Sequence, residues 1–133
     1  MSEENKEIVR RLVDGWQTGH DRAVGEELLA DDFVDRAQGM GPDVSKKNAL
    51  DWWDSTFRAF PDFAAEIKFM VAEGDLVATL KTFSGTHEGP FIGIPPTGRH
   101  ATFDAFDLLR IRDGQIVEHW VVLDVAGVMR QLG

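Results

Sequence analysis

Hydrophobic positions change their spacing once along the chain, close to Pro61. Before this proline, apolar residues recur every three to four positions, which is the spacing of one face of an α-helix. After it they alternate with polar residues, which is the pattern of a half-buried β-strand. The chain therefore predicts an α+β fold, with N-terminal helices packed on one face of a curved antiparallel sheet.

The helical part is divided by residues that typically begin or end helices. Gly19 is suited to the end of the first helix, and Asp21 and Ser45 are suited to N-cap positions. The expected elements are a helix over 4–18, a short helix from Asp21 through Leu29, an extended piece over 31–37, a loop over 38–43 and a helix from Ser45 through Phe60.

The sheet part predicts four long strands and a terminal helix. A Pro/Gly-rich connection covers residues 88–98, and Asp113-Gly114 is the dipeptide that suits a type I′ hairpin turn. The expected strands cover 63–72, 76–87, 99–112 and 115–124, and a helical turn or short helix follows over 125–132.

The Asp113-Gly114 turn also predicts which residues share a face of the sheet. An unbroken antiparallel ladder from this turn places Asp107 directly across from Trp120. His119 then lies on the opposite face. A β-bulge would exchange the two faces beyond it.

Both faces of this predicted hairpin are mostly apolar. An antiparallel sheet with one solvated face alternates more cleanly between apolar and polar residues. We therefore expect helices to cover one face and a second copy of the chain to cover the other, giving a homodimer packed through the sheet. A sheet curved around helices also leaves a cone-shaped apolar cavity, which is a typical site for a hydrophobic small molecule.

Composition narrows the classes of partner. The 133 residues fit one domain, and the net charge of −9 argues against nucleic acid and against an anionic membrane surface. There is no cysteine, so disulfides and thiolate chemistry are excluded. No signal segment or membrane-spanning run is evident, and we expect a cytoplasmic protein. No spacing typical of a metal site, a nucleotide-binding loop or a serine nucleophile is present.

Asp107 and His119 are the candidate catalytic residues. Asp107 is expected in an apolar setting, where burial would raise its pKa toward neutrality and suit it to general acid–base work. The alternative for Asp107 is a carboxylate at a solvated sheet edge or one paired with an arginine. His119 is either catalytic or a hydrogen-bonded histidine of the sheet or the dimer face.

The candidate substrate-contacting residues are mainly aromatic side chains of the core, a few of which must line any open cavity. Asp124 either contributes to the site or caps the terminal helix. His87 reaches a cavity mouth or the surface, and the 88–98 loop is the expected mouth. The full set is Asp35, Trp53, Phe57, His87, Phe91, Phe103, Trp120 and Asp124.

Several short motifs carry a resemblance to a known family. They are Ile8–Val13 and Asp31-Asp32-Phe33 near the start, then Gly93–Arg99 (GIPPTGR), Leu109–Ile116, Glu118-His119-Trp120 and Asp124. Over nearly the whole chain the sequence resembles the SnoaL-like polyketide cyclases. The resemblance implies the nuclear-transport-factor-like fold, a cone-shaped α+β barrel shared with ketosteroid isomerase and limonene epoxide hydrolase.

The resemblance also implies a mechanism and a departure from it. In the aldol cyclases of that family a His and an Asp transfer protons in the cavity, without a metal or an organic cofactor. The family's His position falls on Asp107, its catalytic Asp position falls on Val121, and a further polar position falls near Asp35. Val121 can neither take nor give a proton, so both halves of the family's pair have changed.

We therefore expect a cofactor-free enzyme that closes or isomerises a ring by aldol-type proton transfer on a hydrophobic, polyketide-like carbonyl compound. Asp107 would transfer the proton, helped by His119 or by an ordered water. One alternative is a polyketide hydroxylase or an epoxide-hydrolase-like enzyme of the same fold. The other is a ligand-binding or interaction module without catalysis, which Val121 favours.

Overall fold

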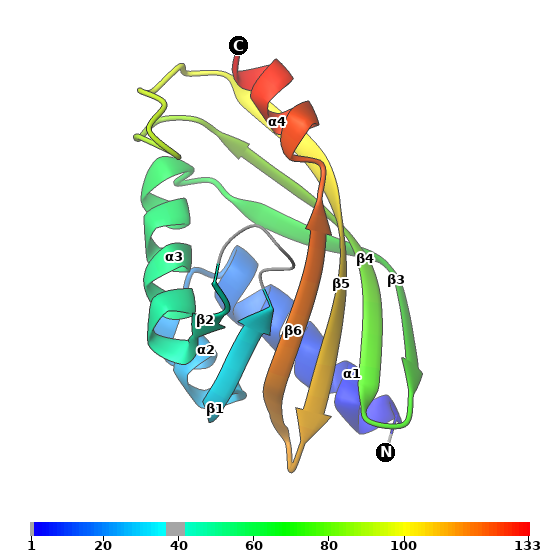
Figure 1. The fold of residues 1–133 in the computed structure, drawn as a ribbon. Coiled ribbons are helices and arrows are strands. Elements are labelled where there is room, and N and C mark those ends of the chain that lie inside the picture. The colour runs from blue at the N-terminus through cyan, green and yellow to red at the C-terminus, as the bar shows by residue number, and fades with distance from the viewer. Residues whose placement is uncertain (1, 37–41) are drawn as a thin grey trace.

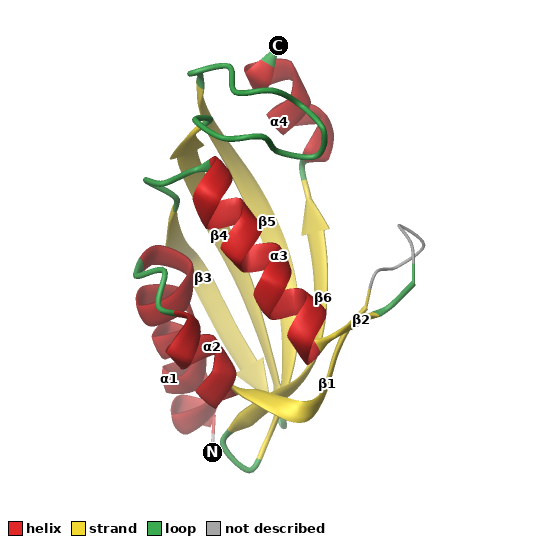
Figure 2. Ribbon diagram, turned by 90° about the vertical axis from the view of Figure 1, so that its left-hand side faces the viewer, coloured by secondary structure: helices red, strands yellow, loops and turns green. Residues whose placement is uncertain are grey.

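The computed structural model describes residues 2–36 and 42–133. Six strands form one curved sheet in the order β2-β1-β6-β5-β4-β3, and helices α1, α2 and α3 lie against one of its faces (Figures 1 and 2). The elements are α1 (Ser2–Arg11), η1 (Leu12–Thr18), α2 (Arg22–Leu28), β1 (Leu29–Arg36), β2 (Val44–Ser45), α3 (Lys46–Ala59), β3 (Ala64–Glu73), β4 (Leu76–Thr86), β5 (His100–Arg112), β6 (Gln115–Leu123) and α4 (Val125–Leu132).

The predicted helices and their caps are present. The Asp21 side chain accepts a hydrogen bond from Ala23 N, and the Ser45 hydroxyl accepts one from Asn48 N. Most of the predicted loop over 38–43 lies outside the described residues. None of the helices in the described ranges is long and apolar enough to cross a membrane.

The predicted first helix changes its geometry after Arg11. It continues as the π-helix η1, in which four of seven residues are buried: Leu12, Val13, Trp16 and Gln17. The wider π turn brings two adjacent pairs of side chains to the interior, so that even the polar Gln17 faces the core.

The sheet is mixed and curved, and it does not close into a barrel. Four of the five strand pairings are antiparallel, but β1 pairs parallel to β6 across a long separation in sequence. The expectation of a purely antiparallel sheet is therefore wrong at this pairing. No hairpin turn joins β1 to β6, so the local turn signals contain no information about their direction.

A β-bulge interrupts the hairpin of β5 and β6. Asp113 and Gly114 both have positive φ, as a type I′ turn requires, and Ile111 pairs with Ile116 as predicted. The next pair is Arg110 with Glu118, so Val117 is one extra residue on β6. Beyond the bulge every residue of β6 faces the side opposite to the prediction.

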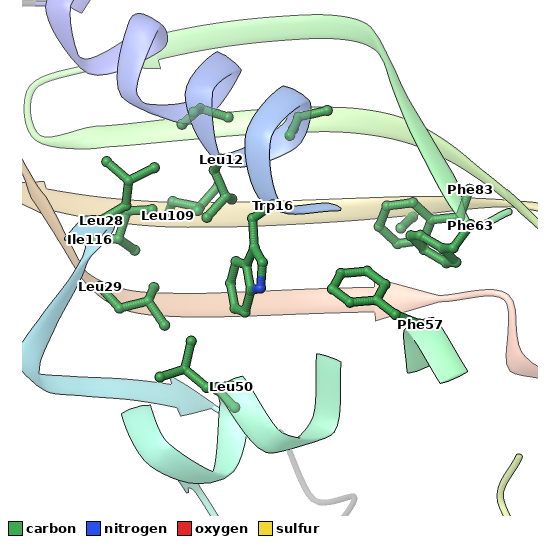
Figure 3. Close-up of a cluster of buried hydrophobic side chains, with 14 of the residues drawn as sticks. Leu12, Trp16, Leu28, Leu29, Leu50, Phe57, Phe63, Phe83, Leu109 and Ile116 are labelled. Atoms are coloured by element: carbon green, nitrogen blue, oxygen red, sulfur yellow. The ribbon is translucent and has the colours of Figure 1, made fainter. Parts of the chain in front are cut away.

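The core lies between the inner face of the sheet and the helices. The Trp16 indole lies between η1 and α3, near Leu29, Leu50 and Phe57 (Figure 3). Toward the other end of the sheet, Phe63 and Phe83 pack against each other with ring centroids 5.2 Å apart. This packing holds α3 over the centre of the sheet.

The outer face of the sheet carries exposed apolar side chains. Strand register places Phe69, Leu80, Phe106 and Val122 in one row across four strands. Phe69, Phe106 and Val122 are each more than 60% exposed. The apolar second face expected from the sequence is therefore present, and helices α1, α2 and α3 lie on the other side (Figure 2).

Candidate active site

A buried ion pair occupies the middle of the inner sheet face. Lys81 Nζ lies 2.7 Å from Asp107 Oδ2, and the exposed fractions of the two side chains are 0% and 2%. The Thr79 hydroxyl donates a hydrogen bond to the other oxygen of Asp107. Thr79 and Asp107 are directly paired across β4 and β5, and Lys81 lies two positions further along the same face of β4.

His119 extends this pair toward the edge of the sheet. Its Nε2 lies 3.3 Å from Asp107 Oδ2, and its Nδ1 lies 3.0 Å from Asp35 Oδ1. Asp35 and His119 are partners in the parallel pairing of β1 and β6. The sequence prediction put His119 and Asp107 on opposite faces, and the bulge at Val117 is the physical reason that they share one.

The hydrogen bonds of His119 favour its charged form. Ionised carboxylates only accept hydrogen bonds, so a ring between two of them must carry a proton on each nitrogen. Burial works against the charged ring, but the hydrogen bonds to Asp107 and Asp35 outweigh burial and raise the pKa of His119 to about 9. With Lys81 and His119 both cationic, two positive charges balance the two carboxylates.

Asp107 is held ionised. Burial by itself raises the pKa of Asp107, but the charges of Lys81 and His119 outweigh burial and hold that pKa below its usual range. The expected rise of this pKa is therefore wrong. The sequence prediction expected apolar neighbours around Asp107. The structure instead gives its carboxylate hydrogen-bonding partners on Thr79, Lys81 and His119.

Two cavities adjoin this cluster. An open, mostly apolar groove of about 590 Å³ lies between α3, β1 and the end of β6, and Trp52, Val121 and Leu123 are among its walls. A smaller, inner cavity of about 30 Å³ has His119 in its wall. The two cavities share Asp35 and Ala49, so Asp35 links the groove to the buried cluster.

The geometry assigns different roles to the two carboxylates. The Asp35 side chain is 27% exposed and reaches the groove, whereas Asp107 lines neither of these two cavities. Asp35 is therefore the carboxylate that a molecule in the groove can touch. Within the described ranges, no group of three or more His, Asp or Glu side chains is arranged to hold a metal ion.

Four of the aromatic candidates, from α3, the 88–98 loop and β5, take different places. Trp53 lines the inner cavity. Phe57 stacks on His20, with ring centroids 4.1 Å apart, and Phe103 packs edge-on against Phe83. Phe91 packs against Phe60 and Trp52, so the 88–98 loop is fastened to α3 at this point.

Three further candidates line neither of the two cavities. Trp120 is on the outer face, paired with Leu108, because the bulge reverses its side. His87 is fully buried and reaches neither a cavity mouth nor the surface. The loop that follows it folds back, so that His87 N donates a hydrogen bond to Arg99 O and His87 O accepts one from Gly98 N. Asp124 accepts a hydrogen bond from Gly127 N and is the N-cap of α4, one of its two predicted roles.

Sequence reasoning missed Lys81 and Thr79. The signal that would have found them is the alternation along β4, in which Val77, Thr79, Lys81 and Phe83 share the buried face. A lysine among apolar residues of a buried face needs a buried partner. The long 88–98 connection gave no register between β4 and β5, so the pairing with Asp107 could not be derived.

The fold and the site together define a class of protein: a helix-covered curved sheet with a cluster of two carboxylates, a histidine and a lysine beside an apolar groove. The family model of the SnoaL-like polyketide cyclases matches residues 6–132. The chain belongs to this family.

Individual relatives agree with this assignment. The aklanonic acid methyl ester cyclase DauD from Streptomyces sp. (strain C5) is 30% identical over 131 residues, covering 96% of this chain and 80% of the relative. The structure of AclR, a proposed hydroxylase from Streptomyces galilaeus, has a TM-score of 0.91 at 30% identity and covers 100% of this chain and 98% of the other. The structure of IdmH, a proposed polyketide cyclase from Streptomyces antibioticus, has a TM-score of 0.83 at 34% identity, with 97% and 98% covered.

Proposed function

We propose that the protein closes or isomerises a ring of a hydrophobic, polyketide-like carbonyl compound by proton transfer, without a cofactor. One observation carries this proposal: the Asp35 carboxylate lies in the wall of the apolar groove and is hydrogen-bonded to the His119 ring, which Asp107 holds from the other side.

Asp35 is the general base in this proposal. Its Oδ1 accepts a hydrogen bond from His119, and a carboxylate has further lone pairs with which to take a proton. The proton comes from a carbon next to a carbonyl group, and the negative charge passes to the carbonyl oxygen. The neighbouring imidazolium favours this charge electrostatically, because the cluster is already fixed in place before the reaction.

Asp107 is a positioning residue in this proposal, which revises the expectation that Asp107 itself transfers the proton. Its carboxylate fixes the His119 ring through Nε2, and Lys81 and Thr79 fix the carboxylate. The contacts therefore run from Asp107 to His119 to Asp35. Asp107, the innermost carboxylate, orients the His119 ring and keeps it charged.

The substrate class rests on the groove and on the relatives. A groove of about 590 Å³ lies in the usual range for small-molecule sites, about 300–1,000 Å³. Val121, Val122, Leu123 and Trp52 offer apolar walls for a flat ring system. The curated relatives DauD and DnrD are named for aklanonic acid methyl ester, and we propose a polyketide ester of this kind as the substrate.

A second candidate function is hydroxylation of an aromatic polyketide. It is favoured by the similarity to the proposed hydroxylase AclR and by Val121, which stands where the resemblance places the cyclases' catalytic Asp. In this case the product would gain an oxygen atom, whereas an aldol ring closure leaves the composition of the molecule unchanged.

Mass spectrometry after incubation with aklanonic acid methyl ester distinguishes these functions. A product of unchanged mass and altered retention time supports ring closure. A product heavier by one oxygen atom, formed only when dioxygen and a two-electron reductant such as NADH are both supplied so that the second oxygen atom leaves as water, supports the hydroxylase. Saturable binding without any product would contradict both and would favour a module without catalysis.

We also propose a homodimer packed through the outer sheet face. The row of Phe69, Leu80, Phe106 and Val122 is apolar across four strands, and a large exposed apolar patch typically marks an interaction surface. Sedimentation velocity at tens of micromolar protein tests this, and a strict monomer would contradict it.

A further inference from the structure

Three side-chain polar atoms in the interior of the described chain have no hydrogen-bond partner there: Nε2 of His87, and Nε1 of Trp16 and Oε1 of Gln17. The last two belong to adjacent residues. The two residues are only 3% and 4% exposed. Protein interiors seldom leave such groups unpaired. Both residues belong to η1, and single π turns are frequent at functional sites.

Both side chains line the inner cavity beside the Asp35–His119 pair. The cavity volume of about 30 Å³ compares with about 10–15 Å³ needed to hold one water molecule. Its other walls are largely apolar and include Leu109 and Ile116. The cavity therefore has room for one or two oxygen atoms and offers polar partners for them.

The hydrogen-bonding chemistry of the two unpaired atoms determines which kind of oxygen atom can satisfy both of them. The indole N–H of Trp16 can only donate a hydrogen bond, and the amide oxygen of Gln17 can only accept one. A carbonyl oxygen satisfies Trp16 alone. A hydroxyl group or a water molecule accepts from Trp16 and donates to Gln17, and so satisfies both.

We propose that the inner cavity is a hydroxyl subsite, which binds water in the free protein and a phenol or enol hydroxyl of the bound ligand. The groove and the cavity are neighbours that share Asp35 and Ala49 in their walls, and in this proposal the ligand extends from the groove into the cavity past these two residues. The binding of a ligand hydroxyl in this cavity rests on the proposed function. The binding of water in the free protein does not, because Trp16 Nε1 and Gln17 Oε1 need a hydrogen-bond partner whatever the protein does.

A high-resolution crystal structure of the free protein tests the water. We expect an ordered water within hydrogen-bond distance of Trp16 Nε1 and the Gln17 amide, and its loss in Gln17→Leu, which removes the acceptor at similar size. The matched control is Gln115→Leu, because the Gln115 amide is exposed and already donates to Glu27 O. A cavity without water in the wild-type protein would overturn the proposal.

Binding of 1-naphthol and naphthalene tests the hydroxyl preference, with tryptophan fluorescence as the readout. We expect 1-naphthol to bind about tenfold more tightly than naphthalene, the effect of one well-formed hydrogen bond. Gln17→Leu and Trp16→Phe should each reduce this ratio while naphthalene binding persists, and Gln115→Leu should leave it unchanged.

An equal affinity of wild-type protein for the two compounds, or a ratio unchanged in Gln17→Leu, would overturn the proposal. A protein with the water and the preference but no turnover of any carbonyl substrate would support the subsite and contradict the proposed function. The two failures are therefore distinguishable.

Discussion

The charge state of His119 predicts how stability depends on pH. In the folded protein its pKa is raised to about 9, from 6.5 for an ordinary histidine. Between these values the folded protein holds a proton that the unfolded chain has lost. The stabilisation is therefore complete below pH 6.5 and disappears as the pH rises through 9.

The magnitude follows from the two pKa values. One pH unit corresponds to about 1.4 kcal/mol, so the difference between 6.5 and 9 amounts to about 3 kcal/mol of unfolding free energy. The His119 side chain is only 19% exposed, so solvent screening reduces this figure little. Such a loss is a large part of the stability of a small domain.

Urea unfolding followed by tryptophan fluorescence, at fixed protein concentration from pH 6 to pH 10, measures this loss. The control is His119→Gln, which cannot titrate and should show a much smaller change over the same interval. Wild-type and variant profiles that run parallel between pH 6.5 and 9 would refute the assignment of a charged His119 between Asp35 and Asp107.

Three further predictions concern the ion pair, the cap and the outer face. Lys81→Met should lower the unfolding free energy by about 3–5 kcal/mol, because it leaves Asp107 buried without its main counter-charge. Adding Asp107→Leu should restore most of the lost stability, and a double variant no more stable in urea than Lys81→Met would contradict the prediction. Asp124→Ala should lower the unfolding free energy by about 1 kcal/mol, since the hydrogen bond to Gly127 N is lost, and should leave turnover intact; a loss of turnover without a loss of stability would instead place Asp124 in the site. Phe106→Glu should convert the proposed dimer to a monomer in sedimentation velocity, because the side chain is 62% exposed on the apolar outer face.

The sequence predicted those parts of the fold that depend on local signals. Asp21 and Ser45 cap the helices that they were expected to cap, and Asp113-Gly114 forms the hairpin turn. In each case a residue of special backbone or hydrogen-bonding chemistry determines the geometry within a few residues. Such signals need no knowledge of the rest of the chain.

The site could be predicted only in part, because its geometry depends on register. Asp35, Asp107 and His119 were all named as candidates, but their mutual contacts depend on the extra residue Val117. Val117 is itself apolar and buried, so the alternation of polar and apolar residues does not reveal the bulge. Lys81 was missed for a similar reason, since no turn signal sets the pairing of β4 with β5.

The most direct test of the central claim is the turnover of aklanonic acid methyl ester by Asp35→Asn, compared with Asp32→Asn. Asp32 lies on the same strand, but it is exposed and pairs with Arg112 at 2.9 Å, so its loss controls for the removal of a charge from β1. Removal of a general base typically lowers the rate by about 10²–10⁴-fold, and we expect such a fall for Asp35→Asn and nearly unchanged turnover for Asp32→Asn. Equal turnover by the two variants would contradict the assignment of Asp35 as the base.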